Sequence, residues 1–396
     1  MNTHLLTNAR IVTPTEHFTG SVSIENGVIA AIHKDRFFKK GIDLQGQWLI
    51  PGCIDIHTDY LEKELHPRSS ASFPLPFALH FLDARAAACG ITTVFSAISF
   101  SDNENKNRNF DGAIRLARQI DESRHSLLVR HFLHARIDPN TDSVLDHLQE
   151  MISLESLYMV VFNENIPGER QYSLNQQIEI RMKEYGYTWE EARDKLLTQI
   201  QETRGINHRE RIYEAFRGKC IIGSHDDTTI HHVLEAKAAG STLSEMPTTL
   251  AAARKAKELN LWVCMGAPNY FRGASHCGNL SCQEAMEEDL VDILCSDYHF
   301  PTMMASVIRM IDEGMSPSKA VNMVSLNPAR LLQFDGETGS ITVGKRADLV
   351  AFWSERCNAS VSEVWVDGTH KFTANYTDPI SPFNAERRAS SIINEE

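Results

Sequence analysis

The stretch Trp48–Tyr60, WLIPGCIDIHTDY, contains an apolar run that ends in two side chains able to bind a metal. The run from Leu49 to Ile56 predicts a buried strand, and His57 and Asp59 follow it two positions apart. Residues two apart in a strand point to the same face, so we expect the imidazole and the carboxylate to lie together at the carboxyl end of this strand. Nitrogen and oxygen ligands together suit Zn²⁺, Mn²⁺ or a similar divalent ion. Taken alone, the pair is more typical of a structural histidine beside a turn aspartate, so the other strands must decide.

Apolar runs alternate with helical patterns through the middle of the chain. A helical pattern is clear in Thr229–Ala239, where Ile230, Val233 and Leu234 recur at helical spacing. Eight strands that alternate with helices predict an α/β fold, a TIM-like (β/α)8 barrel. The strand candidates are Cys53–Ile56, Thr92–Ile98, Leu127–Arg136, Leu157–Phe162, Cys220–Ser224, Thr242–Met246, Leu261–Met265 and Val291–Ser296. The long charged segment Tyr172–Gly218 is predicted to be helical and to cap or flank the barrel mouth.

Both ends of the chain differ from its middle in sequence pattern, which predicts short strands with alternating apolar residues and tight turns. Asn26-Gly27 near the beginning and Asp367-Gly368 near the end are strong hairpin signals. We therefore predict a discontinuous small β-sandwich domain, made of residues 1–49 and 340–376, beside a barrel of residues 50–339. Residues 377–396 form a polar tail.

The composition narrows the class of partner. With 396 residues, 42% of them hydrophobic, the chain can bury a large core, and its net charge of −13 argues against a nucleic-acid binder. A small anionic substrate stays compatible, because local arginines can outweigh the overall charge. No apolar stretch reaches the roughly 18–20 residues of a membrane span. The eight cysteines form no C-x-x-C pair and the start lacks a signal-peptide pattern, so we expect a cytoplasmic protein; a homo-oligomer stays open.

Polar side chains follow seven of the eight predicted strands. In a barrel of this kind, the residues just after the carboxyl ends of the strands build the active site. They are His57 and Asp59; His131, His134 and Arg136; Asn163, Glu164 and Asn165; His225, Asp226 and Asp227; Glu245 and Thr248; Asn269, Arg272, His276 and Asn279; and Ser296, Asp297 and Tyr298. A single strand-end histidine is usually structural, but seven such strand ends favour a metal-dependent hydrolase.

These motifs, together with a small β domain beside a barrel, resemble the amidohydrolase superfamily. Within it the chain is most similar to the PhnM-like group, the ribose 1-methylphosphonate 5-triphosphate diphosphatases of the carbon–phosphorus lyase pathway. The matching pieces are HTDYLEK (57–63), Pro67-Arg68, GITTVFSA (90–97), HFLHAR (131–136), PGERQ (167–171), SHDDTT (224–229), EMPTTL (245–250), the glycine-rich GAPN (266–269) with RG, SH and GN after it, SDY (296–298), NPAR (327–330) and GKRADLV (344–350). They span nearly the whole chain.

The resemblance implies one or two divalent metal ions, with zinc expected and manganese or iron as alternatives. The expected metal ligands are His57, Asp59, Glu164, His225, Glu245 and Asp297. Asp297 is also expected to take the proton from the attacking water, while His276 either donates to a phosphate or leaving group or braces its loop. One of Asp226 and Asp227 is expected to orient His225, and the other to cap the following helix. The expected substrate-binding residues are Lys63, Arg68, Arg136, Arg170, Asn269, Arg272 and Asn279.

The chain departs from the family pattern at three places. His57-x-Asp59 stands where much of the superfamily has His-x-His, and the fourth strand ends in Phe162-Asn163-Glu164 in place of Met-Asp-His, with no carboxylated lysine. Leu82-Asp83 replaces a His-Asp pair. The leading hypothesis is hydrolysis of a phosphoanhydride to a 5-phosphate and pyrophosphate. Two alternatives stay open, a carbon–nitrogen hydrolase or deaminase at the same metal site and a non-catalytic barrel subunit.

Overall fold

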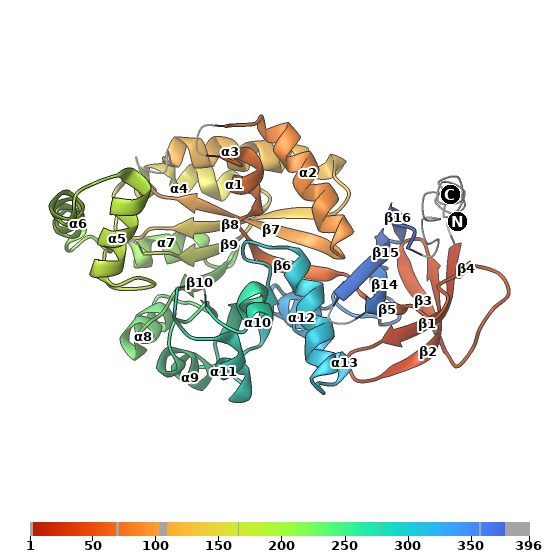
Figure 1. Ribbon diagram of the computed structural model, residues 1–396. Coiled ribbons are helices and arrows are strands. Elements are labelled where there is room, and N and C mark those ends of the chain that lie inside the picture. The colour runs from red at the N-terminus through yellow and green to blue at the C-terminus, as the bar shows by residue number, and fades with distance from the viewer. Residues whose placement is uncertain are drawn as a thin grey trace, which may run out of the picture.

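The computed structural model describes residues 3–68, 71–102, 109–164, 166–275, 277–355 and 358–376. Figure 1 shows a barrel surrounded by helices, with a separate β domain beside it in which the strands of both chain ends meet. No helix in the described ranges is both long and apolar enough to cross a membrane.

The barrel consists of eight parallel strands in which each strand pairs with the next one along the chain. They are β6 (Cys53–Thr58), β7 (Ile91–Phe100), β8 (Arg130–Ile137), β9 (Leu157–Phe162), β10 (Ile221–His225), β11 (Leu243–Glu245), β12 (Trp262–Gly266) and β13 (Ile293–Cys295). All eight predicted strands are present, with ends shifted by a few residues. The predicted barrel is therefore confirmed, and the carboxyl ends of its strands meet at one mouth.

The barrel closes between its first and last strands through backbone hydrogen bonds just beyond β13. The backbone N–H of Asp297 donates to the carbonyl of His57 at 3.0 Å, and the N–H of Asp59 donates to the carbonyl of Asp297 at 2.7 Å. One layer deeper, Asp55 accepts from the backbone N–H of Ser296 at 2.9 Å and from its hydroxyl at 2.5 Å. Three predicted metal ligands thus lie on the seam that joins the two ends of the barrel sheet.

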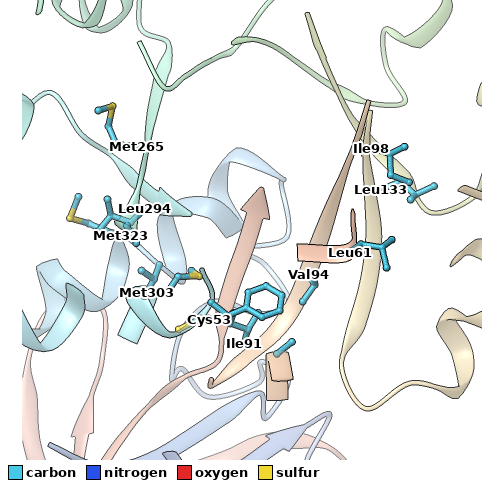
Figure 2. Packing of buried hydrophobic residues seen from close by; sticks show 14 of the residues in the cluster. Cys53, Leu61, Ile91, Val94, Ile98, Leu133, Met265, Leu294, Met303 and Met323 are labelled. Atoms are coloured by element: carbon cyan, nitrogen blue, oxygen red, sulfur yellow. The ribbon is translucent and has the colours of Figure 1, made fainter. Parts of the chain in front are cut away.

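Helices cover the outside of the barrel and bury its apolar surface. They are α1 (Tyr60–Leu65), α2 (Leu75–Ala88), α3 (Phe110–Ser123), the 3-10 turn η2 (Arg124–Ser126), α4 (Ser143–Ser153), α7 (Arg209–Phe216), α8 (Ile230–Ala238), α9 (Leu250–Glu258), α10 (Ala267–Arg272), α11 (Cys282–Glu287), α12 (Pro301–Asp312), α13 (Pro317–Asn322) and α14 (Leu326–Leu331). Figure 2 shows Cys53 of β6 and Ile91 of β7 beside Met303 of α12 in this core. The same apolar cluster continues into the β domain through Val350 and Phe352, so it joins the two parts, while the β domain also has a separate apolar cluster of its own.

The β domain forms one hydrogen-bonded sheet in the order β16-β15-β14-β5-β1-β2-β3, with β4 paired to β1. Its strands are β1 (Thr3–Val12), β2 (His17–Glu25), β3 (Val28–Lys34), β4 (Ile42–Asp43), β5 (Trp48–Pro51), β14 (Leu349–Glu355), β15 (Asn358–Val366) and β16 (Thr369–Thr373). Asn26 and Gly27 have φ angles of 52° and 84°, and Asp367 and Gly368 have 50° and 66°. Two consecutive left-handed residues are typical of a type I′ hairpin turn, which confirms both predicted hairpins.

A buried carboxylate marks the junction between the barrel and the β domain. Asp348, which is 2% exposed, accepts hydrogen bonds from Arg130 of β8 at 2.7 and 3.0 Å and from the hydroxyl of Thr338 at 2.6 Å. The backbone N–H of Asp367 donates to it at 2.9 Å, and the backbone carbonyl of Asp348 accepts from Gly52 at 2.9 Å. Every oxygen of this carboxylate is therefore hydrogen-bonded within the protein.

The segment predicted to flank the barrel mouth contains α5 (Leu174–Tyr185) and α6 (Trp189–Thr203), followed by α7. Figure 1 shows α5 and α6 at the side of the barrel opposite to the β domain. Both helices begin with a capping box, at Ser173 and Thr188, and a small apolar cluster of Ile178, Ala192 and Leu196 joins them. This helix pair therefore packs around a small core of its own.

Candidate metal and active site

Three buried ligand groups from three strands converge at the barrel mouth. His57, His134 and Glu245 belong to β6, β8 and β11, and their exposed fractions are 1%, 0% and 0%. Oε2 of Glu245 lies 3.0 Å from Nδ1 of His57 and 3.6 Å from Nε2 of His134. The three ligand atoms are all within 4.8 Å of one another, which is a spacing that a divalent ion can bridge.

The buried polar atoms of this group fit a metal. Among the described residues, neither oxygen of Glu245 has a hydrogen-bond partner, and neither does Nε2 of His134. Nδ1 of His134 lies 2.9 Å from the carbonyl oxygen of Ile56, which can only accept, so Nδ1 carries the proton and Nε2 presents its lone pair. Buried polar atoms normally have partners, and a carboxylate with none beside a lone-pair nitrogen is the donor set of a metal site.

A second group shares His57 and uses the closing seam of the barrel. It consists of His57, Asp59 and Asp297, again with ligand atoms within 4.8 Å of one another. Nε2 of His57 is 3.6 Å from Oδ1 of Asp59, whereas Nδ1 faces Glu245. The two groups therefore lie on the two nitrogen-bearing sides of one imidazole.

His225, the predicted ligand of the fifth strand, lies at the same place. Its Nε2 is 3.8 Å from Oε2 of Glu245, and its ring centroid is 5.5 Å from that of His57. Nδ1 of His225 lies 3.0 Å from Oδ2 of Asp226, as expected for an aspartate that orients the ring. The structure thus brings His57, Asp59, His225, Glu245 and Asp297 together.

The expected helix cap in this segment is wrong. Thr229 caps α8, since its hydroxyl accepts from the backbone N–H of His232, and Asp227 is buried elsewhere. Asp227 accepts from Ser224 at 2.5 Å, from Ser244 at 3.1 Å and from Arg170 at 2.7 Å. A threonine one residue before the helix already meets its free N–H groups, so the aspartate is available to tie β10 to β11.

The charges of the site shift the pKa values of its groups in opposite directions. Burial alone would raise the pKa of Glu245, but the neighbouring His57, His134 and His225 outweigh it and lower that pKa to about 2. Burial alone would lower the pKa of His57, and Glu245 and Asp59 outweigh it and raise that pKa well above its usual value. Burial dominates at His134 and lowers its pKa to about 4, so this imidazole is neutral near pH 7, as a metal ligand must be.

Glu164 lies apart from both ligand groups. Its carboxylate forms ion pairs with Arg170 and Arg209, and Arg170 also donates to the carbonyl of His225 at 3.2 Å. The role of Glu164 as a metal ligand stays a prediction, while the observed contacts are those of a buried carboxylate between two guanidinium groups.

The predicted substrate-binding residues lie in four different places, and two of them line the main cavity. A cavity of about 590 Å³ at the mouth is lined by Arg136 and Arg170 together with His57, Asp59, His225 and Asp297. Arg136 is 2.9 Å from Asp59 and donates to the carbonyl of Ala97 at 3.3 Å.

Lys63 and Arg272 both contact Tyr298, which also lines this cavity. Nζ of Lys63 donates to the Tyr298 carbonyl at 2.9 Å, and Arg272 donates to the Tyr298 hydroxyl at 3.3 Å. Arg68 is exposed in the α1–α2 connection and does not line the cavity.

Asn269 and Asn279 hold the glycine-rich loop rather than pointing to open space. Asn269 donates to the carbonyl of Leu280 at 3.0 Å and accepts from the N–H of Cys282 at 3.0 Å. Asn279 donates to the carbonyl of Gln171 at 3.1 Å. Both still line a smaller cavity with Asp297 and Tyr298. His276, the second predicted catalytic residue, lies outside the described residues, as does Asn165.

His134 is the member of the ligand group that the sequence-based prediction left out. The sequence did contain a signal for His134. It lies two residues before Arg136 in β8, so both side chains point to the same face, and Arg136 was already expected in the cavity. His131 has the opposite parity and bonds instead to the buried Asp83, at 3.1 Å. Asp83 also accepts from the backbone at 128 and 129, so it has a structural role here.

Three strand ends at the mouth have a backbone that L-residues rarely adopt. Asp226, Met246 and Asp297, which follow β10, β11 and β13, have φ angles of 56°, 54° and 53°. Such left-handed residues cost free energy and cluster at functional sites, where they direct side chains. Asp226 and Met246 each directly follow a predicted metal ligand, and Asp297 is itself a predicted metal ligand.

Comparison with known proteins agrees with this geometry. The amidohydrolase family profile matches residues 196–371. The alpha-D-ribose 1-methylphosphonate 5-triphosphate diphosphatase of Escherichia coli is 31% identical over 382 residues, which cover 93% of this chain and 100% of that protein. An adenine deaminase of Clostridium botulinum is 34% identical over 96 residues, 22% of this chain and 16% of that protein.

The fold is also found in a solved structure, the N-acetylglucosamine-6-phosphate deacetylase from Pasteurella multocida. The match has a TM-score of 0.61 at 15% identity and covers 94% of this chain and 100% of that one. Together with the end-to-end sequence match and the ligand groups at the barrel mouth, this shows that the chain belongs to the amidohydrolase superfamily and is a metal-dependent hydrolase.

Proposed function

We propose that this enzyme hydrolyses the phosphoanhydride of ribose 1-methylphosphonate 5-triphosphate to the 5-phosphate and pyrophosphate. The observation that carries the proposal is a pair of metal-ligand groups around His57, of which His57, Asp59 and Asp297 line a cavity. The guanidinium groups of Arg136 and Arg170 line the same cavity. Guanidinium groups bind phosphate oxygens with paired hydrogen bonds, so an arginine wall suits a polyphosphate. The relative that aligns along the whole chain carries the name of this reaction.

In this proposal, His57, His134, Glu245, Asp59 and Asp297 hold one or two divalent ions, with zinc expected and manganese or iron as alternatives. His225 lies close enough to complete the set. A bound divalent ion lowers the pKa of water and accepts the negative charge that develops on a phosphoryl oxygen.

Asp297 is the residue proposed to accept the proton of the attacking water. Its backbone N–H and its carbonyl both form hydrogen bonds with the end of β6. The position of the residue that carries the carboxylate is therefore fixed at the cavity wall. A proton acceptor must lie within hydrogen-bond reach of the reacting atom, and a rigid backbone secures that reach. Arg136, fixed by Asp59, is proposed to contact the phosphoryl oxygens next to the scissile bond.

The second candidate is a carbon–nitrogen hydrolase or deaminase that uses the same ligand groups. The partial match to an adenine deaminase favours keeping it, as does the position of Glu164 between two arginines at the end of β9. A barrel that binds no metal would instead support the non-catalytic alternative. The described cysteines are all free, which supports the proposal of a reducing, cytoplasmic compartment.

Phosphorus NMR of the metal-loaded protein with ribose 1-methylphosphonate 5-triphosphate tests the proposal. We expect the triphosphate signals to be replaced by those of pyrophosphate and of a 5-phosphate monoester. An unchanged spectrum, from protein shown to hold metal, would contradict it and move the assignment to carbon–nitrogen hydrolysis. Release of inorganic phosphate alone would show a different site of cleavage.

A further inference from the structure

The cavity at the barrel mouth extends well beyond the metal-ligand groups. Its outer wall comes from α5 and α6, through Gln177, Arg181 and Tyr185 of α5 and Gln199 of α6. These helices lie outside the repeating strand–helix pattern of the barrel. The helix pair is therefore part of the substrate pocket as well as a cover for the barrel.

Arg181 differs from the other arginines of this cavity. Arg136 is paired with Asp59, and Arg170 with Glu164 and Asp227, so their charges are balanced within the protein. Arg181 is half-buried and donates to the neutral amide oxygen of Gln199 at 2.8 Å. No ion pair joins it to any carboxylate in the part of the chain that the structure describes, and burial lowers its pKa. A half-buried cation without a carboxylate is suited to an anionic ligand.

The helix pair holds Arg181 in place before a ligand binds. The capping boxes at Ser173 and Thr188 fix the starts of both helices, and Ile178 packs against the apolar residues of α6. An arginine on a packed helix loses less freedom on binding than one on a loop.

The two ends of the cavity carry different charges. At the α5 end, Glu184 also lines the wall, so one cation faces a surface that already contains one carboxylate. Tyr298 also lines the cavity, and two exposed cations, Lys63 and Arg272, contact this tyrosine without lining the cavity themselves. A pyrophosphate group carries several negative charges and a phosphonate monoester carries one. The α5 end therefore suits the phosphonate and the Tyr298 end suits the pyrophosphate.

We propose that Arg181, together with Gln177 and Gln199, binds the singly charged methylphosphonate end of the substrate, opposite to the end that leaves as pyrophosphate. This assignment rests on the proposed function. It makes the α5–α6 pair the element that distinguishes a phosphonate-bearing sugar from other triphosphates.

The test compares two ligands that differ only at that end. Binding of ribose 1-methylphosphonate 5-phosphate and of ribose 5-phosphate to the metal-loaded protein is measured by calorimetry. We expect the wild type to prefer the phosphonate by about ten- to a hundredfold, the range of one charge-assisted hydrogen-bond pair. Arg181→Met should remove this preference and leave the affinity for ribose 5-phosphate unchanged, and Arg181→Lys should retain part of it.

The matched control is Arg193→Met on α6, an arginine beside Trp189 that does not line the cavity. It should keep the full preference. A wild type without preference overturns the proposal, as does an Arg181→Met variant that loses affinity for both ligands equally or for neither. Binding is measured without turnover, so the two proposals can fail separately. If the enzyme prefers the phosphonate-bearing ligand but releases no pyrophosphate, the proposed reaction is contradicted and the proposed subsite is not.

Discussion

Two buried carboxylates in this molecule have opposite surroundings. Asp348, at the junction of the two domains, is 2% exposed and accepts from Arg130, Thr338 and the backbone of Asp367. Glu245, at the barrel mouth, is 0% exposed, and neither of its oxygens has a hydrogen-bond partner among the described residues. A buried charge whose partners are all part of the fold serves the fold. Glu245 instead faces three histidine rings, of which His134 presents a lone-pair nitrogen, and this is a donor set that a metal ion can complete.

Replacing Glu245 with glutamine should have the largest effect on function. The variant loses a carboxylate from the ligand group, so we expect metal content near zero and turnover lower by about 10⁴-fold or more, because every effect of the metal on water and substrate is lost. Elemental analysis and initial rates measure both. A chelator should lower the thermal midpoint of the wild type but leave that of Glu245→Gln unchanged. A Glu245→Gln variant that keeps its metal would contradict the conclusion that Glu245, unlike Asp348, serves a metal ligand group.

Asp297→Asn separates proton transfer from metal binding. The amide cannot accept a proton, so turnover should fall by about 10²–10⁴-fold while most of the metal remains. The left-handed backbone at this position, φ 53°, is tolerated by asparagine, so the fold should be kept. Single-turnover rates and metal content on the same sample give the result. Unchanged turnover would remove Asp297 from its proposed role.

Asp348→Ala should affect stability and not chemistry. Removal of this carboxylate leaves the partly buried Arg130 with Asp367 as its remaining ion-pair partner and takes the acceptor from the Thr338 hydroxyl, and we expect a loss of about 3 kcal/mol in the free energy of unfolding. Urea unfolding measures the loss, and turnover per folded molecule should match that of the wild type. Glu337→Ala, which removes an exposed partner of Arg346, is the control and should change stability by less than about 0.5 kcal/mol. A loss of metal in Asp348→Ala would contradict the conclusion that Asp348 serves the fold and Glu245 serves the metal site.

Glu164→Gln tests whether a third buried carboxylate belongs with Asp348 or with Glu245. Glu164 forms ion pairs with Arg170 and Arg209, so its partners are part of the fold, as those of Asp348 are. The metal content of the variant should therefore stay at the wild-type level. Stability should fall by about 1–3 kcal/mol, because two guanidinium groups lose a charged acceptor. If the metal content falls instead, the predicted ligand role of Glu164 is correct.

Asp367→Asn should give the smallest effect, and only in one pH range. Burial alone would raise the pKa of Asp367, but Arg346 and Arg130 outweigh it and lower that pKa below its usual value. A carboxylate with a lowered pKa contributes stability near neutral pH, and the contribution is lost as the pH falls through the folded-state pKa. We expect a difference below about 1 kcal/mol at pH 7, as for a half-exposed pair, and a smaller one as the pH falls toward the pKa of the folded state. A difference that does not shrink on acidification would mean that the charge is not its cause.

Most of the barrel could be predicted because each strand is a local apolar run bounded by polar residues. The Trp48–Tyr60 stretch located β6 and, once the other strand ends were considered, two members of the candidate ligand groups. The contact of Glu164 with Arg170 could be expected from their closeness in the sequence, but its contact with Arg209 could not, because Arg209 comes from a helix 45 residues further along, outside the repeating pattern. Likewise, the choice between Asp226 and Asp227 depends on which of the two turns toward β11, and only the left-handed backbone at Asp226 decides it.

The backbone hydrogen bonds that join Asp297 to His57 and Asp59 have a consequence for how the chain folds. They join residues from the first and last barrel strands, the pairing with the greatest separation along the barrel sequence, and such contacts form late because the intervening chain must first be ordered. The ligand group on the seam cannot exist in a partly folded barrel. On a ribosome, the chain cannot capture a metal there until Asp297 has emerged, and in refolding experiments activity should return with the slowest major phase.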